Sequence, residues 1–497
     1  MVTFARALFA LGSLALSATL GGCGDEVTSL QGVLPAPSRE GRVADGPWPG
    51  FTLLTPLQSK RVYLVDMAGE AVHTWDTAGK PGLSVYLTER GTLLKCHRVE
   101  NHPVFEDAGG NGGWIQEIDW NGDVLWDFRW DGEQGLSHHD IEPLPNGNIL
   151  FLAWDRIPRA TALAAGRDPE LLKGEEFWSG AIYEVKPEYP SGGEIVWSWH
   201  ALDHVVQQQD ASLPNYAESR QRPERIDING ERSPDVLTDE QRAADQKRME
   251  ALGYVDGGDD AADDEDDEWH AQTADWLHIN GIDYNVELNQ IAVSVRNFNE
   301  VWIIDHGTST EEAAGPAGDL LYRWGNPYAY GLGNWGDRRL HTQHNVQWIP
   351  QGHLGAGNLL VFNNGGRGRE HSSIEEWWPP CDAQGRYLRA PNEAWGPKNT
   401  EWTYVADPPE AFYSPLISGV QRLPNGNTLV CSGEEGRVFE LDSEQRIVWD
   451  WLSPFGPDPD EEEEGNTDLP TAMFRAERYA PDHPGIVALR VKGAPIP

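Results

Sequence analysis

The 497-residue chain has few sulfur-containing residues and few basic side chains, and the shortage of basic side chains excludes some classes of partner. It holds four cysteines, four methionines, and 38 lysines and arginines against 79 aspartates and glutamates, for a net charge of −41. A surface of this charge is repelled by nucleic acid and by anionic lipid head groups, which argues against both as partners. Past the N-terminus no run of roughly 18 apolar residues occurs, so no membrane-spanning helix is predicted.

Much of the negative charge is local. Residues 256–268, DGGDDAADDEDDE, carry nine carboxylates in thirteen positions, and a second run follows at 458–464. Neither run has the regular ligand spacing of a calcium loop, so both are predicted to be solvated segments.

The first 23 residues form a predicted signal peptide, with Arg6 ahead of the apolar stretch 7–20. The following LGGC, ending at Cys23, resembles the bacterial lipobox. That resemblance implies cleavage before Cys23, lipidation of its sulfur, and a tether at 24–49. The alternative is an ordinary secretory signal with a chance cysteine. Gly24, in place of an acidic residue, favours an outer-membrane over an inner-membrane address, so we expect an exported periplasmic or cell-surface lipoprotein.

An exported protein occupies an oxidising compartment, yet Cys96, Cys381 and Cys431 are an odd number of cysteines. At most one disulfide can form among them, and the sequence does not indicate which pair.

A short phrase recurs along the chain. LPNGNILFL at 144–152 is repeated as LPNGNTLVC at 423–431, and Asn-Gly between apolar runs predicts a hairpin whose two central residues have positive φ. Looser copies occur at 89–96, 286–295 and 352–362. A second phrase, a strand carrying tryptophan, occurs at 71–76, 123–130, 194–200, 320–326 and 446–451.

Repeated hairpins in a chain with 53 glycines, 35 prolines and 22 tryptophans predict an all-β fold, a six-bladed β-propeller over residues 50–497. Five units begin near residues 84, 137, 276, 341 and 413, and the sixth at 474–489. The N-terminal strands 50–56 and 62–76 are expected to complete the last blade and close the ring. Residues 201–274 form an acidic, partly helical insertion, helix-like at 238–253, and are expected to be an accessory loop rather than a lid.

Alignment of the units on their hairpin asparagines places polar side chains at one equivalent position. His139 and Ser418 each lie nine residues before that asparagine, His278 eleven and His344 fourteen. The first strand of a blade lines the central channel, so these side chains are expected to meet there. Arg296, which ends a strand in the blade of His278, would add a cation suited to an oxyanion.

A zinc site is the competing interpretation of three histidines, because three imidazoles can hold zinc with a fourth position open. The cation of Arg296 argues against it, and no metal site is predicted.

The ordered motifs resemble those of the bacterial arylsulfate sulfotransferases. They are HHDIEPLPNGN, DWLHINGIDY with SVRNFNEVWIID, TQHNVQW with FNNGGRGR, and SGVQRLPNGNTLV, within about residues 50–495. The resemblance implies a propeller that transfers a sulfuryl group between phenols by ping-pong kinetics, without the nucleotide donor PAPS or any other cofactor. Partners would be small aryl sulfates and phenols, with membrane contact only through the lipid anchor.

The resemblance also implies roles for individual residues. His344 would be the nucleophile, and His278, Asn280 and Arg296 would clamp the sulfate. His139, with His138 as a second possibility, would do acid–base work, and Ser418 would place a hydroxyl near the substrate.

Three expected features depart from the family pattern: a short tail in place of a sizeable N-terminal β-domain before the propeller, the added insertion, and the lipid anchor. They leave open the natural donor and acceptor, the oligomeric state, and two alternative functions. One is a non-catalytic propeller that binds anions, and the other is a metal-dependent hydrolase.

Overall fold

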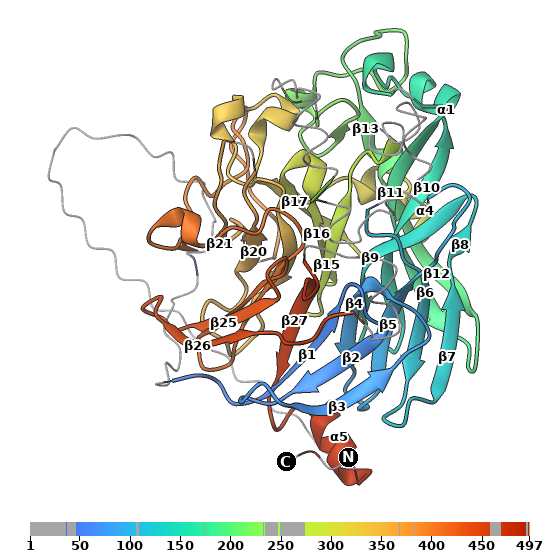
Figure 1. Ribbon diagram of the computed structural model, residues 1–497. Coiled ribbons are helices and arrows are strands. Elements are labelled where there is room, and N and C mark those ends of the chain that lie inside the picture. The colour runs from blue at the N-terminus through green and yellow to red at the C-terminus, as the bar shows by residue number, and fades with distance from the viewer. Residues whose placement is uncertain are drawn as a thin grey trace, which may run out of the picture.

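The computed structural model describes residues 46–105, 109–172, 174–231, 247–248, 274–366, 368–382, 384–457 and 469–493, together with residues 36, 233 and 496. Within these ranges the strands form six larger sheets arranged as the blades of a propeller (Figure 1), plus one short parallel pair. The predicted six-bladed β-propeller is therefore confirmed. The predicted signal peptide with Cys23, nearly all of the tether and both acidic runs lie outside the described residues.

Each blade runs from an inner strand at the axis to an outer strand at the rim. Blade 1 consists of β4 (Pro81–Leu87), β5 (Leu93–Arg98), β6 (Gly113–Ile118) and β7 (Val124–Arg129). Blade 2 has β9 (Gly135–Pro143), β10 (Ile149–Pro158), β11 (Glu176–Pro187) and β12 (Gly193–His200), with β8 (Asp131–Gly132) beside β9. Blade 3 has β15 (Ile279–Asn285), β16 (Gln290–Val295), β17 (Glu300–Asp305) and β18 (Tyr322–Trp324). Blade 4 has β19 (His344–Trp348), β20 (Leu359–Asn363), β21 (Ser373–Trp377) and β22 (Trp402–Tyr404). Blade 5 has β23 (Gly419–Arg422), β24 (Thr428–Ser432), β25 (Arg437–Leu441) and β26 (Ile447–Leu452). Blade 6 has β27 (Met473–Tyr479), β1 (Phe51–Pro56), β2 (Arg61–Val65) and β3 (Ala71–Asp76).

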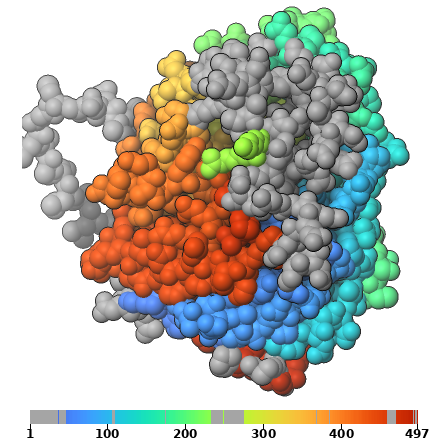
Figure 2. All heavy atoms as spheres, viewed as in Figure 1, coloured from blue at the N-terminus to red at the C-terminus, as the bar shows by residue number. Residues whose placement is uncertain are grey.

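The inner strands contact one another in a closed ring, β4 to β9, β15, β19, β23, β27 and back to β4. Blade 6 closes that ring because strands from the two ends of the chain pair within it, Leu53 opposite Glu477. Figure 2 shows the blue N-terminal strands packed directly beside the red C-terminal ones. The predicted shared blade is confirmed.

The C-terminal end of the sixth repeat differs from the prediction. Its strand stops at Tyr479, and the rest of the phrase forms helix α5 (Pro484–Val491), because Pro484 occupies the first helical turn and His483 caps it. Ile486 and Leu489 pack the helix onto the core between blades 6 and 1.

The recurring hairpin phrase also differs in detail. The loop Pro145–Asn146–Gly147 has three residues, not the two of the predicted turn. Only Gly147 in it has positive φ, and Pro145 is held at negative φ by its ring. Asn148 donates from Nδ2 to Glu184 on the third strand of its blade. Asn427 and Glu440 repeat this bond in blade 5, so the phrase joins the first hairpin to the third strand in blades 2 and 5.

Helices are few in the described ranges: α1 (Arg159–Ala164), α4 (Thr310–Ala313) and α5, none of them long or apolar enough to cross a membrane. Short 3-10 helices occur at Pro169–Leu171 (η1), Ala201–His204 (η2), Ser219–Gln221 (η3), Arg296–Phe298 (η4), Pro316–Gly318 (η5), Pro327–Tyr330 (η6), Trp335–Asp337 (η7) and Pro409–Ala411 (η8).

The described start of the insertion, residues 201–231, contains η2, η3 and the parallel pair β13 (Val205–Val206) with β14 (Ile226–Asp227). Nearly all of the predicted helix-like stretch at 238–253 is outside the described residues. Cys96, Cys381 and Cys431 are buried and unpaired, so the one disulfide that the sequence allowed is not formed among them.

Candidate active site

The inner strands change backbone conformation near their first residues. In the described strands, five blades place a non-glycine residue with positive φ there: Leu83 (87°), His139 (54°), His278 (48°), Asn345 (54°) and Ser418 (84°). In blades 1 to 4 the pairing with the second strand also shifts register at this place. Left-handed non-glycine residues and bulges are strained features that re-aim side chains and cluster at functional sites. In these five blades the same part of the inner strand is thus adapted to present side chains.

Three predicted histidines meet at this end of the ring. The rings of His139 and His278 lie 4.6 Å apart between centroids, and Phe474 on β27 lies 6.2 Å from His139 and 6.3 Å from His344. His139 and His344 are almost completely buried, and the side chain of His278 is 12% exposed. The structure therefore brings His139, His278 and His344 from blades 2, 3 and 4 into one cluster, which we call the histidine cluster.

His344 is held by its Nδ1 atom. That atom lies 2.8 Å from Oδ1 of Asn364 and 3.1 Å from the carbonyl oxygen of Thr342, both of which can only accept. Nδ1 therefore carries the proton, and Nε2 keeps a lone pair. Burial, followed by the nearby charge of Arg296, holds the pKa of His344 well below its usual value, so its ring is neutral at neutral pH.

Arg296 supplies the cation of the site. Its backbone N–H donates to the carbonyl of His278, so the start of η4 is fixed to the start of β15. Its charge contributes to the lowered pKa of His139 as well, after burial and the neighbouring imidazoles. A guanidinium beside the neutral rings of His139 and His344 is suited to the oxygens of a sulfuryl group.

Sequence reasoning missed Asp275. Its carboxylate accepts from Nδ1 of His278 at 2.5 Å and from the indole N–H of Trp154 at 2.9 Å. Burial would raise the pKa of Asp275, but the charge and hydrogen bond of His278 outweigh it and the pKa is lowered. Because Nδ1 is taken, Nε2 of His278 is the atom left for a substrate. The sequence did offer one signal for this pair, an aspartate three residues before the histidine.

His138 supports His139 from behind. The two Nδ1 atoms lie 2.8 Å apart, and the ring of His138 stacks on Trp154 at 4.0 Å. Burial lowers the pKa of His138 to about 3, so the pair shares a hydrogen bond between neutral rings. Gly110 covers His139 from the blade 1 loop, where a β-carbon would lie 2.2 Å from the ring.

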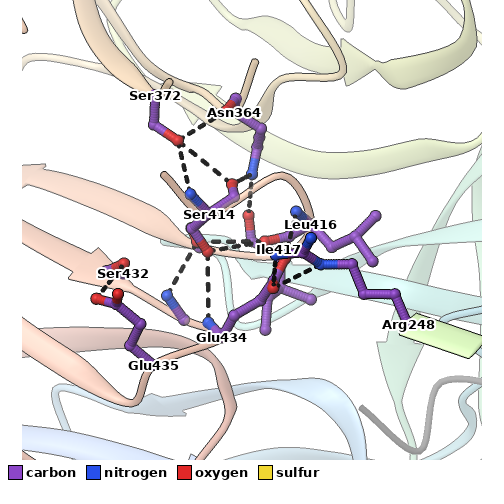
Figure 3. Close-up of polar contacts among 11 residues, drawn as sticks. Arg248, Asn364, Ser372, Ser414, Leu416, Ile417, Ser432, Glu434 and Glu435 are labelled. Atoms are coloured by element: carbon purple, nitrogen blue, oxygen red, sulfur yellow. Dashed lines mark hydrogen bonds and ion pairs between the residues drawn. The ribbon is translucent and has the colours of Figure 1, made fainter. Parts of the chain in front are cut away.

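Asn280 and Ser418 lie at the inner strands, and their hydrogen bonds tie neighbouring segments together. Asn280 donates from Nδ2 to the carbonyl of Gln343 at 2.9 Å, joining blades 3 and 4. Ser418 donates to Oγ of Ser414 and accepts from the N–H of Gly433, both at 2.9 Å. The Ser418 hydroxyl therefore belongs to a network within blade 5, drawn in part in Figure 3.

A charged layer follows the histidine cluster along the inner strands. Arg475 of β27 pairs with Asp140 of β9 at 2.5 Å, and Tyr86 bonds to both. Asp140 also accepts from the backbone N–H of Ile282. This buried layer couples blades 1, 2, 3 and 6 directly beneath the histidines.

A layer of carboxyl groups follows, formed by Glu142, Asp283 and Glu477. Burial raises the pKa of all three, to about 6 for Asp283 and about 7 for Glu477. Across the described residues, no group of three or more His, Cys, Asp or Glu side chains has the arrangement to hold a metal ion.

Comparison with solved structures yields distant matches, and three of them follow. A protein of unknown function from Bacteroides caccae is 12% identical, with a TM-score of 0.42 over 86% of this chain and 98% of its own. The Cps50 (Swd1) β-propeller domain of Myceliophteria thermophila is 9% identical, with a TM-score of 0.36 over 86% and 90%. Virginiamycin B lyase from Staphylococcus aureus is 9% identical, with a TM-score of 0.36 over 83% and 87%.

Curated proteins provide no match to this chain. A family model does, and it matches residues 49–449, which is most of the chain and includes strands of every blade. The chain belongs to the arylsulfotransferase (ASST) family.

Proposed function

We propose that the protein moves a sulfuryl group from an aryl sulfate to a phenol in two steps, through a sulfohistidine at Nε2 of His344. The family match supports arylsulfotransferase activity in general. The observation that carries the specific mechanism is the histidine cluster, in which a buried neutral His344 has its Nδ1 bonded and its Nε2 lone pair left over.

In the first step Nε2 of His344 attacks the sulfur, the N–S bond forms, and the bond from sulfur to the aryl oxygen breaks. A neutral imidazole is required, because a protonated Nε2 has no lone pair. Arg296 would balance the charge that develops on the sulfuryl oxygens, a contribution of the kind that donors aimed at an oxyanion make.

The departing phenolate needs a proton, and His278 is the best-placed donor. Its Nδ1 is bonded to the Asp275 carboxylate, which would stabilise the imidazolium form from which Nε2 gives the proton. The ring centroid of His139 lies 4.6 Å from that of His278. Burial and the adjoining imidazoles keep His139 neutral, so it would orient the aryl oxygen rather than protonate it. This assigns acid–base work to His278, where the family resemblance implied His139.

In the second step the acceptor phenol gives its proton to His278, and its oxygen attacks the sulfur. The N–S bond breaks, the new aryl sulfate leaves, and His344 returns to its neutral form. In this mechanism the same side chains, His344 and His278, serve both transfer steps, so no cofactor is required.

The test is intact-mass measurement of the full chain after mixing with 4-nitrophenyl sulfate. We expect one acid-labile sulfuryl adduct and one equivalent of 4-nitrophenol, both lost in His344→Ala. His341→Ala is the matched control, since His341 lies three residues away and its nearby charges are those of Arg338 and Arg369. An adduct that survives His344→Ala, or none in the unaltered protein, would overturn the proposal.

A further inference from the structure

We infer that Asn364 is the main positioning residue of the nucleophile. Its side-chain oxygen, at 2.8 Å, is a nearer acceptor for Nδ1 of His344 than the Thr342 carbonyl at 3.1 Å, and it favours the tautomer that leaves Nε2 free to react. This inference rests on the proposed function. Asn364 directly follows β20 and is completely buried, and no feature of its motif, FNNGGRGR, distinguished it from Asn363 beforehand.

The orientation of the Asn364 amide is set by its own donors. Nδ2 donates to the carbonyl oxygens of Ser414 at 2.7 Å and Ile417 at 2.8 Å. An inverted amide would place Oδ1 against both carbonyl oxygens, so the nitrogen must face them and Oδ1 must face Nδ1 of His344. Figure 3 shows Asn364 reaching from blade 4 to the segment before β23.

That segment is itself held in place. Ser372 donates to the backbone carbonyl of Asn364 at 2.7 Å and accepts from the N–H of Ser414 at 2.9 Å. Glu434 accepts from the N–H of Leu416 at 2.9 Å and pairs with Arg248 of the insertion at 2.6 Å (Figure 3). The two carbonyls that accept from Asn364, those of Ser414 and Ile417, therefore belong to a loop that is hydrogen-bonded on one side to Ser372 and on the other to Glu434.

The chemistry explains why a neutral amide stands here. When the N–S bond forms at Nε2, the ring becomes cationic and its Nδ1–H bond to Oδ1 becomes charge-assisted, which favours the transition state over the ground state. A carboxylate at this position would favour the imidazolium before reaction and so remove the nucleophile at neutral pH. The amide fixes the tautomer without that penalty.

Asn364→Leu tests the inference, with Asn363→Leu as the matched control. Asn363 is the preceding residue and is equally buried, and it bonds to the N–H of His341 and the carbonyl of Arg339 instead. We expect Asn364→Leu to slow single-turnover release of 4-nitrophenol by about 10²–10⁴, as for an imidazole in the wrong tautomer. KM should change by no more than about threefold, because ground-state binding is retained.

A second readout does not depend on turnover. In ¹⁵N-histidine-labelled protein, with the His344 signals identified from His344→Gln, the nitrogen shifts should show protonated Nδ1 in the unaltered chain and in Asn363→Leu. A mixture of tautomers should appear in Asn364→Leu. An unchanged tautomer in Asn364→Leu, or an equal rate loss in Asn363→Leu, would overturn the inference. An unaltered chain that forms no adduct would instead defeat the proposed function.

Asn364→Asp is nearly isosteric but loses the Nδ2 donor to the carbonyls of Ser414 and Ile417, so near-UV circular dichroism first checks that it folds. If neither Asn364 variant folds, the unaltered chain still tests the inference, because a His344 protonated at Nε2 there would overturn it. Asn364→Asp keeps an acceptor but makes it a carboxylate, which raises the pKa of His344. The acid limb of the pH–rate profile should move to higher pH, and the rate should recover toward that of the unaltered protein as the pH increases. An acid limb that stays in place would contradict the direct contact between Asn364 and His344.

Discussion

The Nδ1 atom of His278 lies 2.5 Å from the carboxylate of Asp275, three residues earlier in the chain. The same carboxylate accepts from the backbone N–H of His278 and from the indole of Trp154, so it is fixed on three sides. This arrangement gives one histidine of the cluster a charged partner, whereas His344 has a neutral amide. The two partners suit the two proposed tasks, proton transfer and nucleophilic attack.

Replacement of Asp275 by Asn should therefore impair proton transfer. We expect kcat to fall by about 10²–10⁴ with phenyl sulfate, and less with 4-nitrophenyl sulfate, whose phenolate leaves without a proton. The comparison of kcat for the two donors is the measurement. Trp154→Phe, which removes one hydrogen bond to Asp275 but keeps an aromatic ring, is the control. Equal losses with both donors would contradict the assignment of acid–base work to His278.

Arg296→Met should have two effects at once. The loss of a donor to the sulfuryl oxygens should lower the rate of His344 sulfurylation by about 10²–10³. Removal of the cation also removes one of the influences, after burial, that lower the pKa of His344. That pKa should rise, and the acid limb of the pH–rate profile should move to higher pH. A slower enzyme with an unmoved acid limb would place Arg296 away from the nucleophile.

Ser418→Ala should affect stability more than chemistry. The substitution leaves the buried N–H of Gly433 without its acceptor and removes one of the hydrogen bonds of Ser414, at a cost of about 1–3 kcal/mol in the free energy of unfolding. Denaturant unfolding measures this cost, and kcat should fall by less than about tenfold. A large loss of kcat with unchanged stability would indicate that the Ser418 hydroxyl contacts the substrate, as the family resemblance implied.

Glu477→Gln should change how stability depends on pH. Burial raises the pKa of Glu477 to about 7, so its contribution to folding is present below its unfolded pKa, near 4.3, and is lost as pH rises through about 7. Glutamine stays neutral and can still accept from the hydroxyl of Tyr479. The Tm of the variant should exceed that of the unaltered protein by about 2 °C at alkaline pH, with the difference shrinking toward pH 5. Exposed Glu287→Gln is the control; a pH-independent difference would contradict the raised pKa.

The architecture could be predicted because its signals are local and repeated. The phrase LPNGN marks the same hairpin in blades 2 and 5, and the spacing from it placed His139, His278 and His344 on equivalent strands. The shared blade followed from the strands left over at the two ends of the chain. Periodic sequence thus indicates periodic structure, and equivalent positions on inner strands come together at the axis.

The partners of these histidines could not be predicted in the same way. Asn364 reaches His344 across a strand pair and is oriented by carbonyls of the next blade, so nothing in its own neighbourhood of sequence distinguishes it from Asn363. The left-handed backbone at His139 and His278 is also not predictable from sequence, because histidine is enriched in that conformation but still adopts it at only a minority of its positions. Side-chain roles depend on these re-aimed strands.

The proposed mechanism is tested most directly by the fate of His344 in a single turnover. Full-length protein mixed with 4-nitrophenyl sulfate, quenched in base and digested, should give one peptide carrying a sulfuryl group on His344, and a phenolic acceptor added before the quench should remove it. A sulfuryl group found on any other residue, or phenol released at full rate by His344→Ala, would contradict the account.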